Sequence, residues 1–208
     1  MFNNRNYDRT YNIGPIFIDG NEIPFVPNSN HGGSYGLNED FTSSGKKFLK
    51  GLWGKTISVR TEGKSNFLLR TEPDSSGGFY IPMSIEMEAN FLDTKQYSLS
   101  GSSSITWQPD PNNPSGKVYL FAVYEGPDSK DTDPSLSDST VVKFEKELSD
   151  NGSYTLLPNE LGNGFPIGSR MSFVLARGSY QTITNSNGTE VILQAVTYST
   201  SNIIAVKQ

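Results

Sequence analysis

Apolar and polar residues alternate along most of the chain from about residue 55 onward. The clearest run covers residues 81–89, where Ile, Met and Ala fall on one face and Ser and Glu on the other. A period of two predicts strands with one buried face and one wet face. Counted from Ile81, about seven such strands follow over about 125 residues, which is close to the usual size of a β-sandwich. They are residues 81–89, 104–107, 118–124, 141–148, 154–157, 171–176 and 191–206.

The strand predicted at 104–107 carries Trp107 and is followed by a loop rich in Pro, Asp, Asn and Gly. Two β-rich runs joined by such a loop, with a Trp in the first, are typical of successive strands in a sandwich whose core the Trp fills. The sequence therefore predicts an all-β protein with an immunoglobulin/fibronectin-III-like β-sandwich. This fold has no built-in chemistry, so the function must be sought in its surfaces and loops.

The N-terminal part has fewer apolar residues than the rest of the chain. Residues 15–26 read as strands broken by a tight turn at Asp19-Gly20. Residues 46–53 place their apolar side chains at helical spacing, which predicts one short helix. With a boundary at the Pro73–Gly78 cluster, we expect an N-terminal β extension (1–76) packed on the sandwich (77–208).

The predicted strand 118–124 is apolar on both faces. One face must point into the sandwich core, and the other needs a cover. We favour the N-terminal extension as that cover. The alternative is an exposed aromatic patch that binds a partner protein or stacks on sugar rings, with Tyr119, Phe121 and Tyr124 as candidate binding residues.

Composition narrows the function further. The net charge of −5 argues against a nucleic-acid partner, because binding to phosphates needs clustered Lys and Arg. The absence of Cys excludes disulfides, iron–sulfur clusters, thiolate zinc sites and thiol nucleophiles. No stretch is long and apolar enough to predict a transmembrane segment.

No residue pattern points to catalysis, so we expect no catalytic residues, no metal site and no cofactor. The single histidine, His31, lies in a Gly-rich loop without an evident partner. Glu86 and Glu88 share the wet face of one strand, which is ordinary for solvated charges. The loop Asp128–Asp138 concentrates carboxylates, and both a solvated turn and a calcium-binding loop stay open for it.

Several segments resemble a known group of proteins. The chain is similar to uncharacterised surface proteins of Bacteroidetes-type bacteria, often lipoproteins, that contain an immunoglobulin-like domain. The resemblance covers roughly residues 54–208 and implies a fold and an environment rather than an activity. The segments that carry it are residues 54–60, 79–82, 105–113, 118–124, 150–158 and 174–179.

We therefore expect a non-enzymatic structural or binding module at a bacterial cell surface, acting in adhesion, assembly or recognition of a protein or glycan ligand. One alternative is a phage virion accessory protein that decorates a capsid or tail. A second is a glycan-acting enzyme or its carbohydrate-binding accessory. The expected location is the cell surface or the extracellular space if a leader was removed, and otherwise the virion. An oligomer or larger assembly is compatible with each reading.

Overall fold

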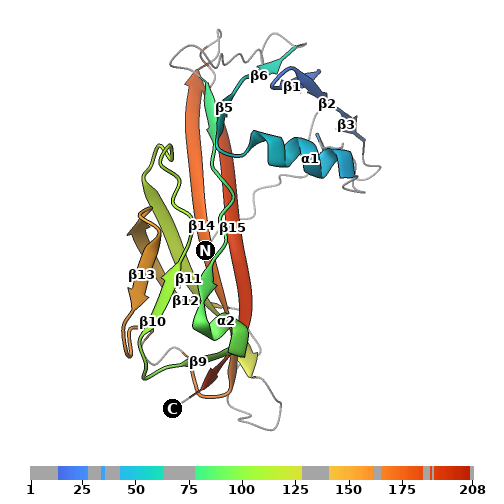
Figure 1. Ribbon diagram of the computed structural model, residues 1–208. Helices are drawn as coiled ribbons and strands as arrows, with labels where there is room; N and C mark the ends of the chain where they lie inside the picture. The colour runs from blue at the N-terminus through green and yellow to red at the C-terminus, as the bar shows by residue number, and fades with distance from the viewer. Residues whose placement is uncertain are drawn as a thin grey trace. The chain divides into compact units, whose positions relative to one another are not determined.

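The computed structural model describes residues 14–27, 34–35, 43–62, 78–127, 141–161, 165–184, 188 and 190–206. Strands and antiparallel sheets dominate these residues, with two short helices among them. The predicted all-β class and its sandwich-like arrangement are confirmed (Figure 1). The second helix, α2 (Asn90–Thr94), was not predicted from the sequence.

The chain divides into two compact units. The first contains residues 1–81 and 180–195, and the second contains residues 82–179 and 196–208. The boundary predicted at 76/77 assigns all of residues 77–208 to one domain. It does not include the return of residues 180–195 to the first unit. The return is possible because β14 (Ser169–Thr184) and β15 (Glu190–Val206) span 16 and 17 residues, about three times the usual strand length. Each strand therefore contributes to both units.

Short strands form the first unit. β1 (Ile16–Ile18) lies between β2 (Asn21–Ile23) and β6 (Val59–Thr61) in one sheet. The β1–β2 hairpin turns at Asp19-Gly20, as the sequence predicts, and both residues have positive φ (48° and 78°). Two further pairs of short strands belong to this unit: β3 (Phe25–Val26) with β4 (Ser34–Tyr35), and β5 (Lys55–Ile57) with β7 (Phe79–Ile81).

Helix α1 (Ser43–Leu52) contains most of the predicted helical segment. It ends before Gly54, whose φ of 73° suits the left-handed conformation that commonly stops a helix. Phe48 and Leu52 pack into an apolar cluster with Ile57 and Phe79. The cluster also includes residues of the short strands and of the returning segment: Ile18, Val59, Ile81, Ile183, Val191, Leu193 and Ala195.

Two sheets form the second unit. The smaller has the strand order β13 (Ser153–Leu156), β10 (Ser103–Thr106), β8 (Glu88–Ala89). The larger has the order β12 (Val141–Ser149), β11 (Lys117–Pro127), β14, β15, β9 (Gln96–Ser98). β11 pairs antiparallel with β12 and with β14, whereas β9 runs parallel to the end of β15.

The long strand predicted at 81–89 is only partly present. Ile85 and Met87 are buried and Glu86 is exposed, as the alternation requires. Between β7 and β8, however, backbone N–H and C=O groups bond to side chains instead of to the backbone of a neighbouring strand. The Met83 N–H donates to Asp110 (2.9 Å) and the Met83 carbonyl accepts from Thr197 (2.8 Å). The segment is therefore extended without being a regular strand.

The core of the second unit lies between its two sheets. Trp107 is 5% exposed, so the prediction that it is buried is confirmed. Phe91, Tyr97 and Phe173 form an aromatic group with ring centroids 4.9–5.4 Å apart. The other fully enclosed side chains are mainly aliphatic and include Ile105, Val118, Leu120, Leu156, Met171 and Leu175.

Candidate functional site

The two faces of β11 differ sharply in exposure. Val118, Leu120, Ala122 and Tyr124 point into the core, and Tyr124 is only 5% exposed. Tyr119 and Phe121 alternate with them on the opposite, half-buried face. The structure therefore brings Tyr119 and Phe121 together but places the third candidate, Tyr124, on the other side of the sheet.

Strand pairing supplies the neighbours of the two rings. Tyr119 lies opposite Glu147 on β12 and Ala176 on β14. Phe121 lies opposite Glu145 on β12 and Val174 on β14. The Tyr119 and Phe121 ring centroids are 6.5 Å apart and the ring planes differ by 19°, so the two rings are stacked nearly parallel along the strand, and we call this pair the platform.

A charged pair holds one end of this platform. The Tyr119 hydroxyl donates to Glu147 Oε2 (3.1 Å), and Lys117 Nζ pairs with Glu147 Oε1. The hydrogen bond to Glu147 raises the pKa of Tyr119, and the hydrogen bond from Lys117 lowers the pKa of Glu147. Near neutral pH the phenol is protonated and the carboxylate is ionised. The exposed pair adds little stability, but it fixes the orientation of the Tyr119 ring.

The platform continues toward β15. Ser172 on β14 hydrogen-bonds with Asn202 on β15 (2.8 Å between Oγ and Oδ1), so these two side chains share a face. Because side chains alternate along a strand, Val196 and Tyr198 lie on that face as well. They are 51% and 66% exposed. We call this surface the aromatic face, and its members are Tyr119, Phe121, Val123, Val174, Ala176, Val196 and Tyr198.

A second polar cluster lies between β12 and β13. Lys146 Nζ lies 2.6 Å from the Tyr154 hydroxyl, and both groups hydrogen-bond to Glu160 Oε1. Burial raises the pKa of Tyr154, and the hydrogen bond to Glu160 raises the pKa of Lys146. Burial also works to raise the pKa of Glu160, but hydrogen bonds from Lys146, Tyr154 and the Leu157 N–H outweigh it and lower the pKa. All three pKa values move away from neutrality, so the cluster suits a structural ion pair that joins the two strands better than it suits acid–base catalysis.

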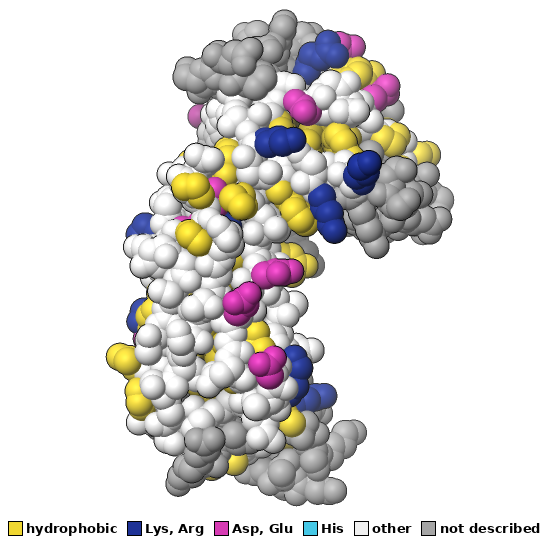
Figure 2. All heavy atoms as spheres, in the orientation of Figure 1, with side chains coloured by type: hydrophobic (Ala, Val, Ile, Leu, Met, Phe, Trp, Pro, Cys, Tyr) yellow, Lys and Arg dark blue, Asp and Glu magenta, His cyan; other side chains and the backbone are white. Residues whose placement is uncertain are grey.

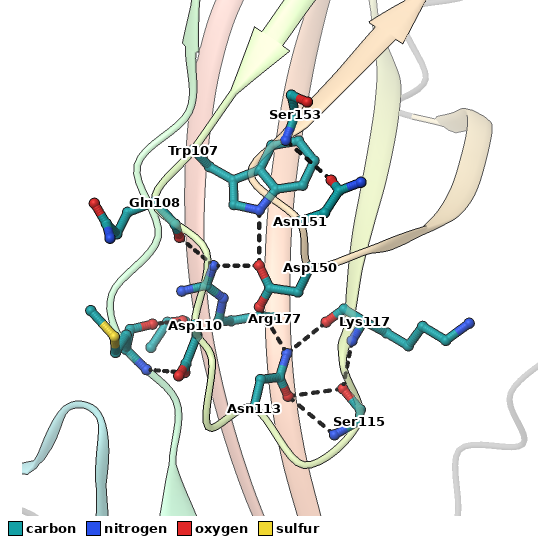
Figure 3. Close-up of polar contacts among 12 residues, drawn as sticks. Trp107, Gln108, Asp110, Asn113, Ser115, Lys117, Asp150, Asn151, Ser153 and Arg177 are labelled. Carbon is teal, nitrogen blue, oxygen red and sulfur yellow. Dashed lines mark hydrogen bonds and ion pairs between the residues drawn. The ribbon is translucent and has the colours of Figure 1, made fainter.

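A third polar group is buried in the second unit (Figure 3). Arg177 on β14 is fully buried, and its Nη2 donates to Asp150 Oδ1 (2.9 Å) and to the Gln108 carbonyl (2.7 Å). Asp150 also accepts hydrogen bonds from Trp107 Nε1 (2.9 Å) and Asn113 Nδ2 (3.0 Å). Arg177 comes from the larger sheet, Asp150 from the turn between β12 and β13, and the other residues from the loop that follows β10 of the smaller sheet. The group therefore ties the two layers together rather than facing a ligand.

Some sequence-based candidates lie outside the described residues. These are His31 and the acidic loop Asp128–Asp138, so the calcium question for that loop stays open. Among the residues that the structure describes, no three His, Cys, Asp or Glu side chains gather as metal ligands would. Glu86 and Glu88 are both exposed. No described helix is long and apolar enough to span a membrane.

Sequence reasoning missed part of the aromatic face. Tyr198 carried a usable signal, since it alternates with polar neighbours in a predicted strand. Glu147 carried none, because its approach to Tyr119 depends on the pairing of β11 with β12 and on a register shift between Ala122 and Val123. Comparison with known proteins finds no matching family model, no matching curated protein and no matching solved structure.

Proposed function

We propose that this protein is a non-enzymatic binding module that holds a glycan on the aromatic face and works at a bacterial cell surface. The observation that carries the proposal is the pair of aromatic rings of Tyr119 and Phe121, which lie on the half-buried face of β11, 6.5 Å apart and 19° from parallel. Flat aromatic rings present an apolar surface that can stack on the C–H face of a sugar ring. The cell-surface location is supported by the resemblance of residues 54–208 to bacterial surface proteins.

The surroundings of the rings favour a glycan over an apolar peptide. Glu145 and Glu147 flank the platform on β12, and carboxylates accept hydrogen bonds from sugar hydroxyls. Lys117 is already paired with Glu147, so the charge that the β12 edge offers to a ligand is negative. A neutral or cationic glycan therefore fits this chemistry better than an acidic one. The half-buried, strand-borne rings are also rigid, which reduces the entropy lost on binding.

Binding without turnover is the expected activity. In the Lys146–Tyr154–Glu160 cluster, each pKa is shifted away from the neutral range that efficient acid–base groups need. The carboxylates beside the aromatic face, Glu145 and Glu147, are exposed on β12. A glycan-acting enzyme and a virion accessory protein remain the competing proposals, and they make different predictions in the same experiment.

A glycan array followed by affinity measurements tests the proposal. We expect binding of a neutral or cationic glycan, weakened about tenfold by Phe121→Ala and by Tyr119→Ala, as for a central interface aromatic. Tyr119→Phe removes only the hydroxyl that contacts Glu147 and should weaken binding less. Trp53→Ala is the matched control, because Trp53 is a partly exposed aromatic residue (38%) of the first unit and lies on none of the strands that form the aromatic face.

Three results would contradict the proposal. Glycan binding that is unchanged in both face variants would place the site elsewhere. Release of new reducing ends would favour the enzyme alternative. Absence of glycan binding, together with self-assembly that the Phe121 variant abolishes, would favour an assembly role such as virion decoration.

A further inference from the structure

Helix α1 in the first unit presents three different surfaces. Phe48 is half-buried and Leu52 is 7% exposed, and both pack into the apolar cluster of that unit. Leu49 and Trp53 are each 38% exposed, although both are large and apolar. Trp53 directly follows α1, and its N–H donates to the Lys50 carbonyl (3.4 Å), so a helical turn continues there. Because residues four apart are neighbours on a helical surface, Leu49 and Trp53 form a short apolar strip beside the packed surface.

Lysines border this apolar strip. Lys47, Lys50 and Lys55 are exposed, and α1 contains no acidic residue in its ten positions. Within the described part of the chain, none of these three lysines forms an ion pair. Figure 2 shows Lys or Arg side chains next to hydrophobic ones over the region that α1 occupies in Figure 1. The basic charge here contrasts with the net charge of −5 of the whole chain.

We propose that this surface docks on a lipid bilayer that carries anionic head groups. Basic residues near an anionic membrane each contribute attraction, and an amphipathic helix can lie in the interface with its apolar side chains at the head-group boundary. Trp53 suits that boundary, because its ring is apolar while its indole N–H can bond to water or head groups. A soluble polyanion would match the lysines but would leave Leu49 and Trp53 in water. The strip therefore favours a lipid surface over an acidic polymer.

Vesicle co-sedimentation of the full-length protein tests this proposal. We expect binding to phosphatidylcholine vesicles that contain phosphatidylserine, no binding to pure phosphatidylcholine, and loss of binding as salt increases. The double variant Lys47→Gln/Lys50→Gln should bind roughly 25-fold more weakly, since about 1 kcal/mol per basic residue corresponds to about fivefold each. The matched control Lys95→Gln/Lys143→Gln makes the same change in net charge in the second unit and should bind as the wild type does.

Tryptophan fluorescence supplies an independent readout. The chain has two Trp residues, and Trp107 is only 5% exposed, so a blue shift on adding anionic vesicles should come from Trp53. Trp53→Phe should abolish the shift, and circular dichroism should show that each variant is folded. Equal binding by the two double variants would overturn the proposal. So would vesicle binding without a Trp53 shift, or heparin binding in the absence of vesicle binding. None of these outcomes depends on the glycan site, which lies in the other unit.

Discussion

Replacing Asp150 with Ala leaves the guanidinium of Arg177 buried without the carboxylate that pairs with it. The Arg177 side chain is 0% exposed and that of Asp150 is 2% exposed, so water cannot take over the lost contact without opening the core. Breaking a buried ion pair by removing one partner costs about 3–5 kcal/mol. Trp107 Nε1 and Asn113 Nδ2 lose an acceptor at the same time. For a chain of this size, the melting temperature of the second unit should fall by roughly 6–20 °C.

The opposite truncation should cost less. Arg177→Met removes a side chain whose Nε and Nη1 have no hydrogen-bond partner among the described residues, and Asp150 keeps two neutral donors. Replacing a buried ion pair by apolar groups is often close to neutral, so the Asp150→Ala/Arg177→Met double variant should be more stable than Asp150→Ala alone. A double variant that is more stable than Asp150→Ala alone would show that the loss comes from an unpaired buried charge, because simple loss of packing would make the double variant less stable.

Urea unfolding gives the measurement. In a Trp53→Phe background the remaining fluorescence comes from Trp107, which touches Asp150 and therefore reports on the second unit. A loss of less than about 1 kcal/mol in Asp150→Ala would refute the reasoning, because that is the size of an ordinary single hydrogen bond. So would a double variant whose loss equals the sum of the two single losses.

Four further predictions follow from the same structure. Trp107→Ala should cost about 3–5 kcal/mol, and an unchanged melting temperature would contradict its place in the core. Glu160→Gln should flatten the acid side of the stability–pH curve: a lowered pKa stabilises the fold above the ordinary value of about 4.3, and this contribution is lost as the pH falls through the folded-state pKa. Burial raises the pKa of Tyr97 to about 12, so stability should fall as the pH rises from about 10 toward 12, and Tyr97→Phe should remove this loss in alkaline urea titrations. Deleting residues 1–54 should expose the apolar side chains of the 183–195 segment and increase binding of a hydrophobic dye, and equal dye binding would argue against this.

The features that sequence could predict depend on local alternation. Period two separated the two faces of β11 without saying which one is buried, and a strand followed by a turn-rich loop placed Trp107 in the core. For Tyr124 the prediction of a binding residue did not follow this alternation. Its position alternates with those of Tyr119 and Phe121, so the three side chains cannot lie on one face of a regular strand, yet all three were predicted as binding residues. The structure follows the alternation.

The features that sequence could not predict depend on distant pairing. Arg177 meets Asp150 and the Gln108 carbonyl only after three segments have assembled, and Arg is normally expected at the surface. The pairing of Tyr119 with Glu147 needs the register of two strands that are separated by residues 128–140. The extended segment after β7 looked like a strand because its side chains alternate. Its backbone bonds to Asp110 and Thr197 are invisible to a pattern of apolar positions.

The division of β14 and β15 between the two units has a consequence for synthesis on the ribosome. The first unit needs residues 180–195 and the second needs residues 196–206, although their other parts are made much earlier. Neither unit can complete its sheet until nearly the whole chain has emerged. The N-terminal strands and α1 must wait, with Leu52 and Ile57 uncovered, for partners more than a hundred residues downstream. This order of events predicts slow, late folding and a need to protect the nascent chain from aggregation.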